Sequence, residues 1–153
     1  MRRAAMLLAL AAGALAGPAL ARSHAQCPWR GEGPVVRVFT AEAPWREAFT
    51  GPEDSVLGAP VDWAAQDVLV FALGEQRTMG VTVAAEPGDL SGTGRRTRLD
   101  VTITRPGPDD MVAMALSRPC VVLAVPKRTW SRVEVRDRTR GEVVWRGRPK
   151  VRR

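Results

Sequence analysis

Three apolar runs in the middle of the chain constrain the fold most strongly. They are DVLVFAL at 67–73, TRLDVTIT at 97–104 and CVVLAV at 120–125. The first and third are almost continuously apolar, which is typical of strands buried on both faces. The second alternates apolar with polar residues, which predicts a strand with one face in water. Polar segments with Pro and Gly separate the runs, so a protein built on β-sheets is expected.

Shorter patterns on either side add further elements. Residues 41–49 carry apolar side chains three and four positions apart, which predicts a helix, and Thr40 precedes it as a candidate cap. MVAMAL at 111–116 is ambiguous between a strand and a helical turn. We expect the other strands at 35–39, at 81–85 as the return of a hairpin with 67–73, and at 133–136 and 143–145 as a second hairpin.

These elements predict a mainly β fold. We expect a small antiparallel β-sandwich or partly open barrel of about seven or eight strands, with one short helix packed at an edge. Residues 26–60 would supply a strand, the helix and a loop, residues 61–127 the core, and residues 128–153 a basic hairpin and tail. The 128 residues that follow position 25 suit a single domain.

Residues 1–25 have the features of an export signal. Two arginines follow the first methionine, residues 6–15 are apolar, and ALA at 19–21 or SHA at 23–25 offers a small-residue cleavage site. The apolar stretch is shorter than the roughly 20 residues of a membrane-spanning helix, although an uncleaved anchor is the alternative. The mature protein is therefore expected to be periplasmic or secreted.

Positive charge is concentrated in the C-terminal part. Residues 26–126 carry nine basic and 13 acidic side chains, whereas residues 127–153 carry 11 basic and three acidic ones. Arginines in the tail alternate with Val and Glu, which indicates a solvated strand face, and residues 147–153 are expected to be disordered. An anionic envelope surface is an alternative partner for this tail. Nucleic acid is not expected as a partner, because an exported protein meets little DNA.

Two cysteines, Cys27 and Cys120, remain after removal of the leader. An oxidising compartment permits a disulfide between them, and an exposed free thiol would be a liability there. The bond would close a loop of 93 residues. The alternative is a small buried Cys120 in the core and a free thiol on Cys27.

Composition excludes most catalytic chemistry. His24, the single histidine, lies in the expected leader, and the chain has no tyrosine. Nucleophile systems and zinc sites that need histidine therefore lose an essential group. Two cysteines 93 residues apart lack the spacing of a metal chelate. We expect no enzymatic activity, no metal and no cofactor.

Paired carboxylates are the remaining catalytic candidates. Glu53-Asp54 and Asp109-Asp110 lie in loops with Pro and Gly, where adjacent acids are usually solvated. A hydrolase that uses Asp109 and Asp110 is the least favoured hypothesis. SGTGRR at 91–96 lacks the Lys-Ser/Thr ending of a phosphate loop and leads into a strand rather than a helix, so it does not predict such a loop.

Three segments of residues 61–127 share their order and spacing with a known family. They are VDW before DVLVFALGEQRT, the loop RPGPDDMVAMALSRP and the strand CVVLAVPK. This stretch resembles the C-terminal domain family of PrcB, a protease-complex subunit. The resemblance implies an exported, non-enzymatic domain that binds or stabilises a protease. Similar Thr-Gly loops occur in chagasin-like cysteine-protease inhibitors, so inhibition is a related alternative.

The turn GEQRTMG departs from the pattern of this family, in which a glycine and a basic residue precede Thr-Gly-Gly-Tyr. Met79 replaces the first glycine of that motif, and Val81 replaces the tyrosine. These changes remove a backbone position free to adopt φ > 0 and an aromatic anchor. Cys120 stands where the family commonly has an aromatic residue. The chain agrees with the pattern at Gly74, Arg77, Thr78 and Gly80.

The leading hypothesis is a protein-binding module associated with an envelope protease. A small β domain without catalytic groups offers its loops and sheet edges as the functional surface. The alternatives are an envelope structural or anionic-surface-binding protein that acts through its basic tail, and a chagasin-like inhibitor. We expect the partner to contact two turns, formed by Arg77, Thr78, Met79 and Gly80 and by Ser117, Arg118 and Pro119.

Overall fold

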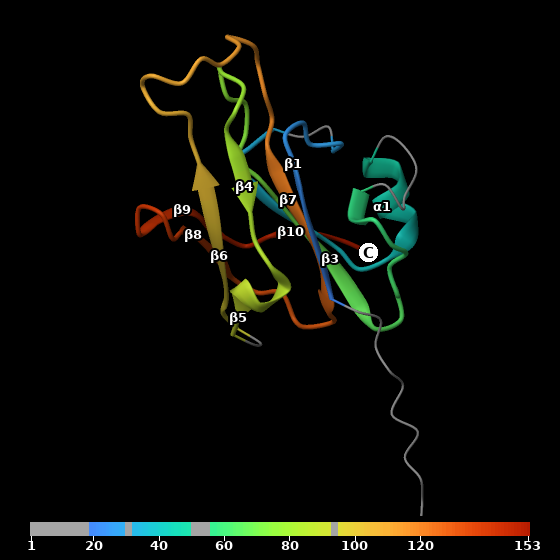
Figure 1. The fold of residues 1–153 in the computed structure, drawn as a ribbon. Helices are drawn as coiled ribbons and strands as arrows, with labels where there is room; N and C mark the ends of the chain where they lie inside the picture. The colour runs from blue at the N-terminus through green and yellow to red at the C-terminus, as the bar shows by residue number, and fades with distance from the viewer. Residues whose placement is uncertain (1–18, 30–31, 50–55, 93–94) are drawn as a thin grey trace, which may run out of the picture.

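Two β-sheets packed face to face form the body of the protein in the computed structural model, which describes residues 19–29, 32–49, 56–92 and 95–153. The first sheet has the order β1 (Leu20–His24), β7 (Cys120–Pro126), β3 (Gln66–Ala72), β2 (Val35–Phe39) and β10 (Lys150–Arg152). The second contains β4 (Thr82–Ala84), β6 (Thr97–Thr104), β8 (Val133–Asp137) and β9 (Glu142–Gly147), with β5 (Leu90–Ser91) paired to β6. The predicted β-sandwich is confirmed (Figure 1).

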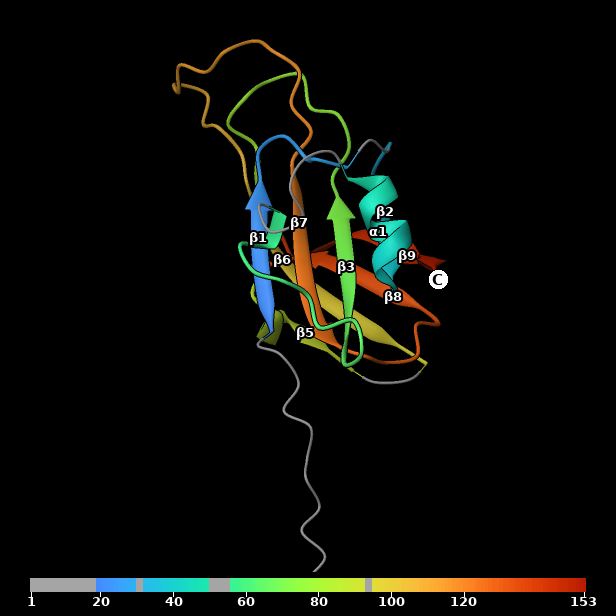
Figure 2. The ribbon, with the colours of Figure 1, turned by 90° about the vertical axis from the view of Figure 1, so that its right-hand side faces the viewer.

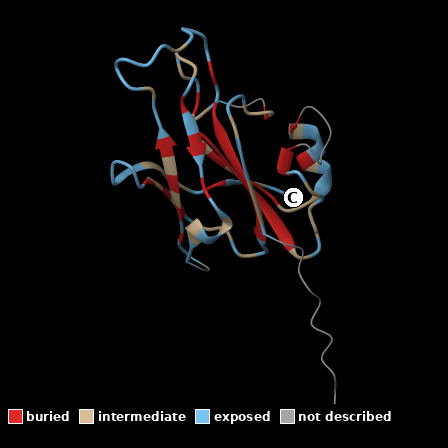
Figure 3. Ribbon diagram, viewed as in Figure 1, coloured by how far each residue is buried: buried red, intermediate tan, exposed pale blue. Residues whose placement is uncertain are grey.

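The two central strands of the first sheet are buried on both faces. Side chains that alternate along β3 and β7, among them Leu69 and Leu123, point into the main core between the sheets. The intervening residues, such as Val68 and Val122, pack into a second core on the outer face of the first sheet. Both strands therefore appear buried along almost their whole length in Figure 3. This agrees with the continuous apolar runs of the sequence.

The helix α1 (Glu42–Ala48) covers the second core. Trp45 is 1% exposed and packs edge-on against Phe39 with ring centroids 5.4 Å apart. The predicted cap is wrong, because Ala41 precedes the first helical residue and provides no side-chain hydrogen bond. The hydroxyl of Thr40 instead donates to the carbonyl of Arg152 at 3.2 Å, which ties the start of the helix to β10.

The predicted hairpin between 67–73 and 81–85 is also wrong. β4 lies in the second sheet and pairs with β6, with Val83 opposite Ile103. Both edges of β3 are already occupied, by β2 and by β7. The connection after β3 therefore crosses from one sheet to the other, with Gly74 adopting φ +91°.

The C-terminal tail is part of both sheets. The predicted hairpin is confirmed as β8 and β9. The expectation of disorder at 147–153 is wrong for residues 150–152, because β10 pairs in parallel with β2 and Val151 lies opposite Val38. The described residues contain ten strands rather than seven or eight, since β1, β5 and β10 are short edge strands without a distinctive apolar pattern. MVAMAL at 111–116 is neither a strand nor a helix.

β1 lies within the stretch expected to be a leader. It pairs with β7 over five residues, from Leu20 opposite Ala124 to His24 opposite Cys120. His24 also contacts the carbonyl of Val56 through Nε2 at 2.8 Å. A mature chain that begins at residue 26 would lack this strand and leave the edge of β7 unpaired. Within the described residues, no helix has the length and apolarity needed to span a membrane.

The predicted disulfide is confirmed. Cys27 and Cys120 are bonded, with their Cα atoms 5.4 Å apart. Cys120 is fully buried at the start of β7, and the segment after β1 is thereby attached covalently to a central strand. The acidic pair Glu53-Asp54 lies outside the described residues.

Candidate partner-binding loops

Two long connections leave the sandwich at the same end. Residues 73–81 join β3 to β4, and residues 105–119 join β6 to β7; Figures 1 and 2 show them side by side. Gln76 and Ser117 exchange backbone hydrogen bonds of 2.7 and 2.9 Å, and Leu73 N–H donates to the carbonyl of Pro119 at 3.1 Å. We call these two segments the paired loops. The two turns singled out in the sequence are thus neighbours.

Ser117 and Pro119 hold the paired loops together from inside. Ser117 is 1% exposed, and its hydroxyl donates to the carbonyl of Thr78 at 2.8 Å. Pro119 is buried, next to the start of β7. Their side chains therefore support the loops and do not face solvent.

The other predicted contact residues reach the surface to different degrees. Arg77, Gly80 and Arg118 are exposed, while Thr78 and Met79 are half-buried. Arg118 pairs with Glu75 at 3.1 Å, an exposed ion pair worth less than about 1 kcal/mol. Met79 N–H donates to the carbonyl of Ala113 at 3.0 Å, so the backbone of the first loop is bonded to the second near its tip.

Gly80 is required where the paired loops approach each other. Its φ of +88° lies in the left-handed region, and a Cβ atom would lie 3.1 Å from Pro106 Cγ and 3.2 Å from Val112 Cγ1. A cavity of about 340 Å³ lies beside it, lined also by Met111. A larger residue at position 80 would push the second loop away from the first.

The most exposed apolar side chains lie on the second loop, and the sequence analysis did not identify them as a surface. Met111 is fully exposed, Met114 is 81% exposed and Leu116 is 57% exposed. Among the described residues, the other large exposed hydrophobic side chain is Val143. The available signal was an apolar run, MVAMAL, directly after the strand-breaking PGPDD, with no periodicity that assigned it to the core.

Charged contacts anchor the base of the second loop. Arg105 lies 3.5 Å from the carboxylate of Asp137, which is fully buried. Burial alone would raise the pKa of Asp137, but hydrogen bonds from Thr139 and Arg105 outweigh it and hold the pKa below its usual range.

Asp110 accepts a hydrogen bond from Gly107 N–H at 2.6 Å and so stabilises the PGPDD turn. Nowhere in the described part of the chain do three or more His, Cys, Asp or Glu side chains form a group that could hold a metal ion.

Comparison with known families addresses the same region. Residues 68–126 match the family model described as PrcB C-terminal. Over this segment the chain is similar to the PrcB C-terminal family. The PrcB C-terminal segment runs from β3 to β7 and contains both paired loops, and the resemblance seen in the sequence is confirmed. A comparison with curated proteins found no match, and one with solved structures found none either.

The PrcB C-terminal segment needs the rest of the chain to complete its sheets. It contains the central strands β3 and β7 of the first sheet but only β4, β5 and β6 of the second. The hairpin of β8 and β9 supplies the remainder of the second sheet, and α1 covers the outer face of the first. The two sheets are therefore built from strands both inside and outside the matched segment.

Proposed function

We propose that this protein is an exported, non-enzymatic binding module that associates with an envelope protease through the paired loops. The observation that carries the proposal is the exposure of Met111, Met114 and Leu116 on a loop whose backbone is bonded to its neighbour. The family match supports a role beside a protease rather than a catalytic one. The partner would bury these side chains on association.

The physical argument concerns apolar surface and adaptability. Burying one methionine side chain contributes about 1.5–3 kcal/mol, and a contiguous exposed apolar patch is typical of a protein interface. Methionine side chains adapt to irregular partner surfaces. Hydrogen bonds at Gln76, Ser117 and Met79 hold the loop backbones, which limits the entropy lost on binding.

The loop proposal predicts the effect of Met111→Asp combined with Met114→Asp. Because both side chains are exposed, the thermal stability should change little, while affinity for the protease should fall by at least about tenfold. The measurement is co-purification of the tagged protein from an envelope extract, followed by titration of the purified protease that it captures.

Val143→Asp is the matched control, because Val143 is an exposed apolar residue on β9 outside the paired loops. It should retain the protease at the wild-type affinity. Equal capture of the protease by the double variant and by the wild type would exclude the paired loops as the contact. A separate measurement of protease activity, with and without the module, would distinguish stabilisation of the protease from its inhibition.

The basic tail is not proposed as a separate anionic-surface segment. Its residues form β9 and β10, which pair with β8 and with β2, so the tail does not extend freely from the domain. Two arginines of this C-terminal part, Arg132 and Arg146, instead line a pocket on the second sheet, which is described below.

We also propose that export removes the chain up to Ala19. Leu20 packs against the second core and Ala21 against the main core, so a strand of the first sheet would be lost by cleavage after residue 25. Gly17 and Ala19 supply the small residues that a cleavage site requires. The mass of the protein isolated from the envelope should correspond to a first residue of Leu20. A first residue of Arg22 or Gln26 would contradict this proposal.

A further inference from the structure

A pocket of about 450 Å³ lies on the second sheet, at the opposite end of β6 from the paired loops. β6 begins beside this pocket at Thr97 and ends at Thr104, directly before the second loop. Four of the side chains around the pocket are arginines. The lining residues are Ser91, Gly92, Arg96, Thr97, Arg98, Arg132, Glu134 and Arg146.

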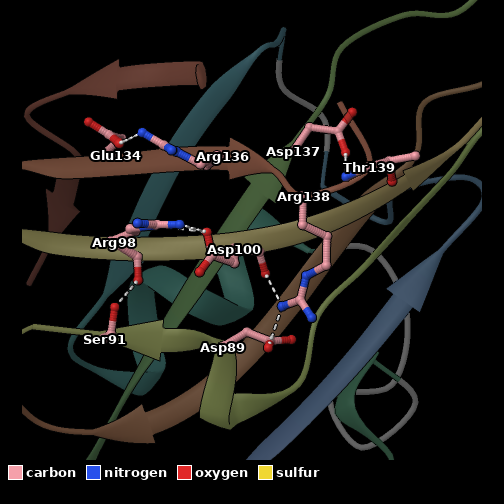
Figure 4. Close-up of polar contacts among 9 residues, drawn as sticks. All are labelled: Asp89, Ser91, Arg98, Asp100, Glu134, Arg136, Asp137, Arg138 and Thr139. Atoms are coloured by element: carbon pink, nitrogen blue, oxygen red, sulfur yellow. Dashed lines mark hydrogen bonds and ion pairs between the residues drawn. The ribbon is translucent and has the colours of Figure 1, made fainter. Parts of the chain in front are cut away.

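The register of the sheet brings these residues together. Ser91 on β5 lies opposite Arg98 on β6, Arg98 opposite Glu134 on β8, and Glu134 opposite Arg146 on β9. Figure 4 shows the first three on neighbouring strands. The row therefore runs across four strands and places polar side chains along one line.

Arg96 and Arg132 lie at the end of this row. Each immediately precedes a strand, β6 and β8 respectively, and Thr97 N–H donates to the carbonyl of Arg132 at 2.9 Å. The two arginines thus stand at adjacent strand starts. Two guanidinium groups on neighbouring strands repel each other unless an anion lies between them.

The other two arginines of the pocket, Arg98 and Arg146, form ion pairs with carboxylates. Arg146 donates to the carboxylate of Glu134 through Nε at 3.0 Å and Nη2 at 2.7 Å, and these bonds hold the pKa of Glu134 below its usual range. Arg98 pairs with Asp100 at 2.8 Å (Figure 4). Across the described residues, neither Arg96 nor Arg132 forms an ion pair or a side-chain hydrogen bond. The pocket therefore keeps a positive charge after its internal pairs are counted.

Gly92 lies beside Arg96 at the wall of the pocket. Gly92 adopts φ +82°, and a Cβ atom there would lie 2.3 Å from the carbonyl oxygen of Arg96. Arg128 Nη1 donates to the carbonyl of Gly92 at 3.2 Å and so holds Gly92 in place. Thr97 is 2% exposed, and among the described residues its hydroxyl has no hydrogen-bond partner. Thr97 shares its face of β6 with the core residue Leu99, so its hydroxyl is on the core side of the strand and is not a proposed ligand.

We propose that this pocket binds a phosphate-type anion between Arg96 and Arg132. Guanidinium groups donate two parallel hydrogen bonds to phosphate oxygens, and two of them at adjacent strand starts can share one anion. The site is unlike a phosphate loop, because a strand, β6, rather than a helix follows Arg96. It does not depend on the paired loops or on the proposed protease partner. The phosphate can be a free anion or the headgroup of a lipid.

The test compares two variants with the same loss of charge. Arg96→Gln with Arg132→Gln removes the proposed ligands, whereas Arg140→Gln with Arg153→Gln removes two exposed arginines outside the pocket. One arm titrates inorganic phosphate and follows backbone amide shifts by NMR. The other arm measures flotation with phosphatidylglycerol vesicles against phosphatidylcholine vesicles at two salt concentrations.

Phosphate should shift the amides around Ser91, Thr97 and Glu134, and the pocket variant should bind at least about tenfold more weakly than the wild type. The control variant should stay within about twofold. Binding to phosphatidylglycerol vesicles that the pocket variant loses, without binding of inorganic phosphate, would identify a lipid headgroup as the ligand. The proposal is overturned when neither arm detects binding, or when the control loses as much affinity as the pocket variant.

Discussion

Replacing Cys27 and Cys120 with serine is expected to lower the free energy of unfolding by about 4 kcal/mol. The disulfide closes a sequence separation of 93 residues, and a cross-link over a long loop removes much conformational freedom from the unfolded chain. Cys120 is fully buried at the start of β7, so a serine hydroxyl there would also need a hydrogen-bond partner. Urea unfolding of the oxidised wild type and the double variant measures the difference.

Reduction of the wild type provides the matched control. It breaks the same bond without changing a residue, and its unfolding curve should move toward that of the double variant. Coincident curves for the oxidised wild type and the double variant would contradict the expected role of the bond. Loss of the disulfide should also loosen the paired loops, because the residues next to it are bonded to the second loop. Cys27 N–H donates to the carbonyl of Arg118 at 2.7 Å, and the side-chain amide of Gln26 donates to the carbonyl of Leu116 at 3.1 Å. Faster proteolysis between residues 105 and 119 would report this.

Asp67→Ala is expected to destabilise the protein by about 3 kcal/mol. Asp67 is 2% exposed at the start of β3, and its carboxylate accepts hydrogen bonds from Trp130 Nε1 at 2.8 Å and Lys127 Nζ at 3.0 Å. The backbone N–H of Arg128 also points to it at 3.3 Å. Removing the carboxylate leaves these donors without their acceptor in a partly buried place. The free energy of unfolding from urea titration is the measurement.

Two further variants serve as comparisons for the loss of stability in Asp67→Ala. Asp67→Asn keeps an oxygen acceptor for Trp130 and should cost less than the alanine variant. Asp100→Ala removes a carboxylate from a more exposed ion pair with Arg98 and should cost less than about 1 kcal/mol. If Asp67→Ala is no more destabilising than Asp100→Ala, the buried network does not stabilise the fold as proposed.

The sequence predicted the residues of the two loops but not their contact with each other. The departures at Met79 and Val81 drew attention to the first loop, and Ser117 to the second. Their pairing depends on hydrogen bonds between residues about 40 positions apart, which no local pattern encodes. Similarly, SGTGRR at 91–96 does not match the pattern of a phosphate loop. Only the parallel pairing of β6 with β8 brings Arg132 beside Arg96.

The sequence by itself determined the elements whose side chains report their own surroundings. Continuous apolar runs identified β3 and β7, because a strand buried on both faces has apolar residues at every position. Alternation identified β6, because a strand buried on one face has apolar residues at every second position. The presence of two cysteines also predicted the disulfide between Cys27 and Cys120.

Tertiary structure alone decided the features that depend on what lies opposite a residue. The short strands β1, β5 and β10 form because the edges of longer strands offer unpaired backbone groups, whatever their own periodicity. Met111 and Met114 have the chemistry of core residues, yet they are exposed, because no strand or helix of the described residues covers the loop that carries them. Burial is a property of the surrounding three-dimensional packing, and a residue's own type does not specify it.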